Sequence, residues 1–176
     1  MGMSVEQRLT LLEKRLQLVE DELAIRNVMT RYGLAVDCGD VPAALSCHSE
    51  DAVYTVSAPT AGRDDGEPAE DLKLVGHQAI RDMLTSDMHQ SLLPNCAHTV
   101  GPVCVEVAEG VAKSTGYSRL YRRENETFNL MRLAINEWHF KRRASGWVIV
   151  SRESRLLGED EAQQLLTRSA FNPASG

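Results

Sequence analysis

The sequence predicts a single α+β domain in which N-terminal helices pack on a strongly curved, mainly antiparallel sheet and enclose one pocket. Three observations lead to this prediction. The chain has 176 residues and is 43% hydrophobic, which is enough for one sizeable core. Helical periodicity fills the N-terminal part, whereas four long strand-like segments follow one another in the C-terminal part. Helices first and hairpin-connected strands later are typical of α+β layering rather than of parallel βαβ units.

The first helix carries a narrow apolar seam. Its apolar residues recur at alternating spacings of four and three: Val5, Leu9, Leu12, Leu16, Val19 and Leu23. Such a seam packs either against its own domain or against another subunit. We expect a homo-oligomer, with residues 1–20 as a helical extension at the contact. From Ile25 to Val36 the apolar stripe is broader, as suits a helix that lies on a sheet, so either two helical segments or one bent helix is expected.

A turn, a short helix and the first strand follow. Gly39 ends the first helical region, and Asp40 with Pro42 is typical of the start of a new helix. The segment Ala52–Val56 is predicted to be a strand. Residues 57–71 collect glycines, prolines and acids, so we expect an exposed loop that could close over the pocket as a lid.

The rest of the chain is predicted to contain one helix and an antiparallel meander. Apolar spacing indicates a helix over Gly76–Met88. Four long strands follow, separated by turns: Ala97–Val107, Val111–Arg123, Thr127–Arg143 and Gly146–Arg155. Residues 158–176 are predicted to form a C-terminal tail that begins as an acidic helix.

Charge and composition argue against several classes of function. The formal net charge of -6 argues against a nucleic-acid partner, because duplex binding draws on many converging Lys and Arg side chains. No run of about 18 apolar residues occurs and the N-terminus is too charged for a secretory leader, so we expect a cytoplasmic protein with no membrane partner. The cysteines form no CxxC pair, and neither HxH nor HExxH spacing occurs. A metal site or other cofactor is therefore not expected.

Asp37 and His98 are the residues most suited to acid–base chemistry. Asp37 extends the apolar face of the first helical region. A carboxylate there either turns to solvent, bonds a backbone amide, or acts as a general base or orienting group. His98 opens a long strand, from which its ring can point beneath the helices. A lone strand histidine is usually structural, but a facing carboxylate makes it suited to proton transfer near neutral pH.

Three further residues are candidates for the pocket wall. Alternation along the third long strand places Asn136 on the same face as Trp138, and an amide there can offer both a donor and an acceptor to a substrate oxygen. Tyr32 and Tyr54 either pack in the core or present their hydroxyls to a ligand. An apolar cavity under aromatic strands favours a polycyclic or aromatic alcohol over a sugar or a phosphate ester.

Several short motifs in this order carry a family resemblance. They are Glu22-Leu23-Ala24-Ile25-Arg26, Arg31-Tyr32, Val36-Asp37, Gly39-Asp40, Asp51-Ala52-Val53-Tyr54 and Gly146-Trp147-Val148-Ile149. Together with the order of elements, they resemble the SnoaL-like branch of the nuclear-transport-factor-2-like superfamily. The resemblance runs from about Glu20 to Arg155, and it implies a cone-shaped α+β barrel with a SnoaL-like domain over residues 21–157.

Within this branch the chain resembles the scytalone dehydratases, the bile-acid 7α-dehydratases and the hexachlorocyclohexane dehydrochlorinases. These enzymes pair an aspartate of the first long helix with a histidine that opens a strand. Asp37 and His98 fall on those positions, so the resemblance implies that they form the catalytic pair. It also implies substrate-binding roles for Tyr32, Tyr54, Asn136 and Arg155. The second histidine used by scytalone dehydratase has no counterpart that we can place.

The implied function is a cofactor-independent lyase that eliminates water from a hydroxylated polycyclic or aromatic substrate. His98 would remove a proton from a carbon next to an activating group, while Asp37 orients its ring and stabilises the imidazolium. The same pair could instead serve an isomerase or a cyclase acting on a polyketide or steroid. A non-catalytic subunit or a ligand-binding protein of the same fold is the remaining alternative.

Overall fold

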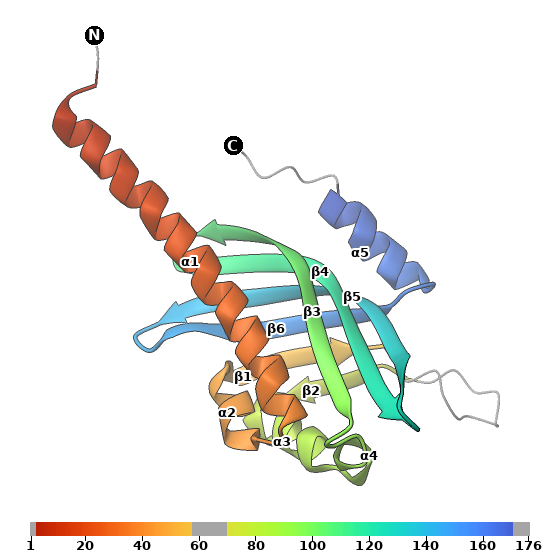
Figure 1. Ribbon diagram of the computed structural model, residues 1–176. Coiled ribbons are helices and arrows are strands. Elements are labelled where there is room, and N and C mark those ends of the chain that lie inside the picture. The colour runs from red at the N-terminus through yellow and green to blue at the C-terminus, as the bar shows by residue number, and fades with distance from the viewer. Residues whose placement is uncertain (1–2, 58–69, 171–176) are drawn as a thin grey trace.

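The computed structural model describes residues 3–57 and 70–170 and has the predicted α+β class (Figure 1). It opens with one long helix, α1 (Val5–Asp37). The other helices are α2 (Val41–Ser46), α3 (Gly76–Thr85), α4 (Asp87–Gln90) and α5 (Asp160–Ala170). The strands are β1 (His48–Val56), β2 (Leu72–Val75), β3 (Cys96–Ala108), β4 (Val111–Glu124), β5 (Thr127–Arg143) and β6 (Gly146–Leu156).

The described strands form one open sheet in the order β2-β1-β6-β5-β4-β3. All neighbouring pairs are antiparallel except β1 and β6, which run parallel. Irregularities interrupt the register of β3 with β4, β4 with β5, and β5 with β6. Because such irregularities bend strands and increase their twist, they account for the strong curvature that Figure 1 shows. The strongly curved, mainly antiparallel sheet of the prediction is confirmed.

Helix α1 lies across the sheet and is anchored by a carboxylate near each end of its buried part. The side chain of Asp21, which is 6% exposed, accepts a hydrogen bond of 3.0 Å from Trp147 Nε1 and pairs with Arg142. At the other end, Asp37 bonds His98 of β3. Between them one face of the helix packs against the core, and its buried residues are Ile25, Val28, Met29, Tyr32 and Val36.

The N-terminal part of α1 extends beyond the sheet (Figure 1) and carries the predicted seam on its surface. It begins with a capping box, in which the Ser4 hydroxyl accepts from the Gln7 backbone and the Gln7 side chain accepts from the Ser4 backbone. The helix then continues without a break over 33 residues. The change of apolar pattern at Ile25 therefore marks a change in the surroundings of one helix, not a boundary between two.

Most of the other predicted elements are confirmed, and three differ. Strand β1 begins at His48 instead of Ala52. Strand β2 was not predicted, and the single helix expected over Gly76–Met88 is divided into α3 and α4 at Ser86. The four long strands lie where the sequence places them, and the acidic start of the C-terminal tail forms α5. Most of the predicted lid, residues 58–69, and the last six residues lie outside the described ranges.

Helix α5 covers the outer face of the sheet. Ala162 and Leu165 pack on Ile135 of β5, and Arg168 pairs with Glu137 at 3.2 Å. This face is separate from the core beneath α1, whose largest fully buried side chains are Trp138, Tyr54 and Phe140. In residues 3–57 and 70–170, no helix has both the length and the apolar character needed to span a membrane.

Candidate active site

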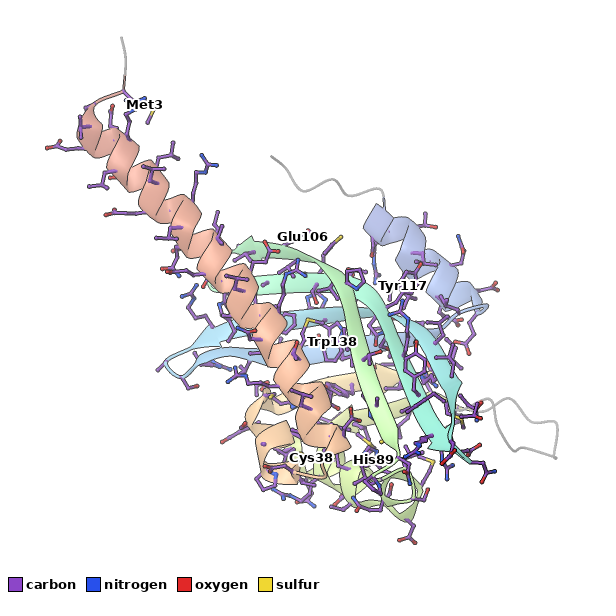
Figure 2. All side chains as sticks on the ribbon, viewed as in Figure 1. Met3, Cys38, His89, Glu106, Tyr117 and Trp138 are labelled. Atoms are coloured by element: carbon purple, nitrogen blue, oxygen red, sulfur yellow. The ribbon has the colours of Figure 1, made fainter. Side chains whose placement is uncertain are left out.

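A cavity of about 180 Å³ lies between the C-terminal half of α1, the helices α3 and α4, and the inner face of the sheet. Much of its wall is aliphatic, with side chains such as Val36, Leu74, Met83, Leu84, Val100 and Leu120. Figure 2 shows Trp138 in the interior beneath α1 and His89 where α4 meets the start of β3. Both side chains belong to the cavity wall. The cavity therefore combines apolar surface with a small number of polar groups, as ligand sites do.

The predicted pair, Asp37 and His98, meets at this cavity. Asp37 Oδ1 lies 2.6 Å from His98 Nδ1. The backbone N–H of His98 donates to both carboxylate oxygens, at 3.0 and 2.9 Å. Three contacts thus fix the carboxylate relative to the ring. The Asp37 and His98 side chains are 21% and 30% exposed, so the pair is partly buried but still accessible.

Gly33 explains how helix and strand come close enough for this contact. A Cβ atom at this position would lie 2.8 Å from the backbone oxygen of His98, which is closer than real Cβ contacts allow. Gly33 is one helical turn before Asp37, so the absence of a side chain there lets α1 approach β3 where the carboxylate must reach. The sequence places glycine where the geometry of the pair requires it.

The hydrogen bonds determine which ring nitrogen of His98 can act as a base. A carboxylate only accepts hydrogen bonds, so the bond to Asp37 places the proton of the neutral ring on Nδ1. The lone pair is then on Nε2. His98 lines the cavity, and its Nε2 has no hydrogen-bond partner in the ranges 3–57 and 70–170. In the neutral ring, the nitrogen that remains free to accept a proton thus belongs to a residue of the cavity wall.

Two further residues surround the pair, and both were missed by the sequence reasoning. The ring of His89 stacks on that of His98, with centroids 5.8 Å apart and planes at 29°. Burial, reinforced by the nearby His98, lowers the pKa of His89, which favours its neutral form. On the other side, Cys96 Sγ lies 3.7 Å from Asp37 Oδ1. Burial and the adjacent carboxylate raise the pKa of the Cys96 thiol to about 11.

Asp37, Cys96 and His98 also present one oxygen, one sulfur and one nitrogen within 4.8 Å of one another. These atom types suit a borderline-soft cation such as Zn²⁺. A cation would, however, have to remove the proton of a thiol whose pKa is raised to about 11 and break the hydrogen bond between the other two residues. The chemistry of the pair favours proton transfer over metal binding.

The inner wall of the cavity carries a positioned arginine. Arg152 Nε donates to Asn136 Oδ1 at 2.9 Å. The guanidinium carbon lies 4.4 Å from the centroid of the Trp138 ring and 5.6 Å from that of Tyr54. Asn136 is fully buried and its Nδ2 donates to Ser118 Oγ at 2.7 Å. Asn136 therefore holds the arginine in place from behind, and Arg152 rather than Asn136 belongs to the cavity wall.

Tyr32 and Tyr54 both line the cavity, as part of a cluster of edge-to-face rings with His48 and Trp138. His48 Nδ1 lies 2.8 Å from the Ala44 carbonyl, so it carries the proton, and Nε2 accepts from the Tyr54 hydroxyl. Burial lowers the pKa of His48 to about 4 and raises that of Tyr54 well above its usual value. The Tyr54 hydroxyl thus already donates its hydrogen bond to His48. Tyr32, whose pKa burial also raises, is the better placed to serve a ligand.

Arg155, the remaining predicted substrate-binding residue, is not part of the cavity wall. It pairs with Asp71 and, at 2.9 Å, with Glu153 on the other face of β6. The cause is a bulge at Val150: Ser151 pairs with His139, whereas Ile149 pairs with the next residue of β5. The extra residue reverses which side chains of β6 face inward, so that Arg152 takes the place that simple alternation gives to Arg155.

Comparison with known proteins places this fold and cavity in a family. The sequence profile described as the SnoaL-like domain matches residues 17–153. The chain belongs to the SnoaL-like family. Domains with this fold include isomerases, dehydratases and ligand-binding proteins. None of the curated proteins matches the sequence.

Solved structures agree with the SnoaL-like assignment. The chain is 34% identical to a nuclear-transport-factor-2-like protein with a cystatin-like fold from Novosphingobium aromaticivorans, covering 94% of this chain and 99% of that one with a TM-score of 0.78. It shares 17% identity with a protein of unknown function from Mycobacterium tuberculosis, covering 87% and 88% with a TM-score of 0.65. A protein of unknown function from Pseudomonas putida shares 14% identity, covering 83% and 92% with a TM-score of 0.60. The last two similarities show the fold alone.

Proposed function

We propose that the protein is a cofactor-independent lyase that eliminates water from a hydroxylated cyclic ketone. The observation that carries this proposal is the Asp37–His98 pair, whose free ring nitrogen belongs to a residue of the cavity wall. A histidine oriented by a carboxylate is a general base that works near neutral pH. Positioned proton transfer of this kind contributes roughly 10²–10⁴-fold to a rate.

The reaction follows from the protonation state of the pair. His98 Nε2 takes a proton from the carbon next to the substrate carbonyl, and the electrons of that C–H bond move toward the carbonyl oxygen. Asp37, held by the His98 backbone N–H, stabilises the imidazolium that forms. When the electrons return to form the carbon–carbon double bond, the hydroxyl on the neighbouring carbon leaves and receives the proton from His98. Water is released, and the pair regains its starting state.

Arg152 is suited to stabilise the negative charge that develops on the carbonyl oxygen. Its guanidinium belongs to the cavity wall, and its Nε is held by Asn136. A preorganised cation in a sheltered site stabilises such a charge without having to move during the reaction. Tyr32, in the same wall, is the candidate for hydrogen bonding to the leaving or the retained oxygen.

The volume of the cavity limits the size of the substrate. An engineered cavity of about 150 Å³ holds one benzene molecule, so about 180 Å³ suits one ring, or one ring with part of a second. The aliphatic wall and the aromatic rings of Tyr32, Tyr54 and Trp138 favour an aromatic or fused-ring skeleton. We therefore propose a small hydroxylated aromatic or fused-ring ketone as the substrate.

The test is a panel of β-hydroxy ketones built on one, two and three fused rings, assayed for loss of water by mass spectrometry. The native protein is expected to dehydrate at least one member, and His98→Ala to reduce kcat by about 10²–10⁴-fold. His139→Ala is the matched control, because this histidine is bonded to Glu137 away from the cavity wall.

The products separate the alternatives. A product of unchanged mass with a moved double bond would make the protein an isomerase that uses the same pair. Binding of panel members without any conversion would make it a ligand-binding member of the family. Equal rates for the native protein and His98→Ala would remove His98 from the mechanism and with it the proposal.

A further inference from the structure

The apolar seam at the start of α1 has no cover within the described chain. Its six side chains are each between 55% and 81% exposed: Val5, Leu9, Leu12, Leu16, Val19 and Leu23. Single exposed leucines are common, but an aligned row of six on one projecting helix is not. In proteins, most of the stability of a helix comes from the packing of its apolar face rather than from helix propensity. These exposed side chains therefore form a surface suited to packing against a partner.

The sheet of the same chain is on the wrong side to be that partner. An α-helix advances 100° per residue, so the seam lies roughly 170° around the axis from the stripe of Ile25, Val28 and Tyr32 that faces the sheet. Leu18, on the sheet side, lines a groove with Val105 and Val107 of β3. Val19, at the edge of the seam, also lines this groove, whereas Leu16 and Leu23 do not and are more than half exposed. The two apolar faces of α1 therefore serve two different surfaces.

The charges beside the seam indicate what covers it. In heptad terms, Leu9, Leu16 and Leu23 occupy a positions, and Val5, Leu12 and Val19 occupy d positions. The flanking g positions then hold Arg8, Arg15 and Glu22. The flanking e positions hold Glu6, Glu13 and Glu20. In a parallel coiled coil each g residue faces the e residue five positions later in the partner helix. Arg8 then faces Glu13 and Arg15 faces Glu20.

In an antiparallel arrangement Arg8 would face Glu22, but Arg15 would face Arg15 of the partner. The glutamates at the e positions would also face one another. The parallel arrangement pairs only opposite charges, whereas the antiparallel one brings more like charges together than opposite ones. We propose that residues 5–23 form a parallel coiled coil with the same residues of a second copy of this chain. This interface is independent of the proposed catalytic activity, and it brings the domains of the two copies to the same end of the coiled coil.

The proposal is tested by the mass of the full chain in solution, measured by sedimentation equilibrium over a range of concentrations. The native protein is expected to have at least twice the 19.5 kDa mass of the chain. Glu13→Lys/Glu20→Lys places like charges across a parallel seam and is expected to raise the dissociation constant on the order of 10- to 100-fold. Adding Arg8→Glu and Arg15→Glu to that variant reverses every pair and is expected to restore association.

Two controls keep the result specific. Glu109→Lys/Glu126→Lys changes the net charge equally at exposed turns of the sheet, and its dissociation constant is expected to equal the native one. Leu9→Asp/Leu16→Asp is expected to give a monomer whose far-ultraviolet spectrum retains the sheet signal, because these side chains lie outside the domain core.

Three outcomes would overturn the proposal. The first is a native protein that is monomeric at high concentration. The second is an oligomer that persists in Leu9→Asp/Leu16→Asp, since another surface would then hold the copies together. The third is a fourfold charge variant that fails to associate although the native protein does, because the helices would then not lie parallel in this register.

Discussion

Replacing Asp37 by asparagine changes the hydrogen-bond character of one atom at the centre of the pair while keeping the shape of the side chain. In the native protein both carboxylate oxygens accept from the His98 backbone N–H, and Oδ1 also accepts from His98 Nδ1. The amide offers only one oxygen. If that oxygen keeps the backbone N–H, the NH₂ group faces Nδ1 and the ring must carry its proton on Nε2 instead. The nitrogen that faces the ligand then lacks its lone pair.

The expected loss follows from what the pair supplies. Without an available base, the contribution of proton transfer disappears, and without the carboxylate the imidazolium is no longer stabilised. Together these effects predict a decrease of kcat by about 10²–10⁴-fold, which corresponds to about 3–5 kcal/mol in the activation free energy. Since the side chain keeps its volume and part of its hydrogen bonding, the melting temperature should change by only a few degrees.

The assay combines the rate of dehydration with the ¹⁵N spectrum of the histidine side chains. Asp37→Asn should lose activity and, in the same sample, move the His98 proton from Nδ1 to Nε2. Asp87→Asn, an exposed carboxylate at the start of α4, serves as the matched control and should behave as the native protein does. The reasoning is refuted if Asp37→Asn keeps at least a tenth of the native kcat, or if the native ring already carries its proton on Nε2.

Three other predictions follow from the same structure. Because the pKa of His48 falls from 6.5 in the unfolded chain to about 4 in the fold, its contribution to stability is complete above pH 6.5 and is lost as the pH falls toward 4. Urea unfolding should therefore show about 2–3 kcal/mol less stability at pH 4.5 than at pH 7.5 from this group, and His48→Gln should remove that part of the pH dependence. Gly33→Ala should lower both the melting temperature and kcat, because the added Cβ would clash with the His98 backbone. This loss is expected although alanine is more favourable than glycine in a helix by about 1 kcal/mol. An increase in the melting temperature would contradict the clash. Arg152→Met should lower kcat/KM by about 10- to 100-fold. Arg152→Lys, which keeps the positive charge, should lower kcat/KM less than Arg152→Met does. Equal kcat/KM values for the two variants would show that the charge has no role.

The sequence was sufficient for features that local patterns determine. The four long strands alternate and end at turn residues, so their positions could be predicted. The alternation placed Asn136 and Trp138 on one face without deciding whether that face was buried, and both side chains are fully buried in the fold. Asp37 was conspicuous because a carboxylate extended an apolar helix face. The contact between Asp37 and His98 was expected from the family resemblance, and the distances now show it.

Other features depend on tertiary packing that no local pattern reveals. Strand β2 has only four residues and exists through its pairing with β1. Arg155 was expected at the pocket from the family resemblance, but the bulge at Val150 changes the inward face of β6, so that Arg152 lines the cavity instead. His89 lies at the end of a short helix, and only the fold stacks its ring on that of His98.

The exchange of a substrate proton with solvent tests the central claim most directly, because it reports proton abstraction even when no leaving group is present. A cyclic ketone that binds the cavity but lacks the hydroxyl is incubated in deuterium oxide, and deuterium at the carbon next to the carbonyl is followed by nuclear magnetic resonance. The native protein is predicted to catalyse this exchange, and His98→Gln to slow it by about 10²–10⁴-fold while His139→Gln leaves it unchanged. Exchange at the native rate in His98→Gln would contradict the assignment of His98 as the base.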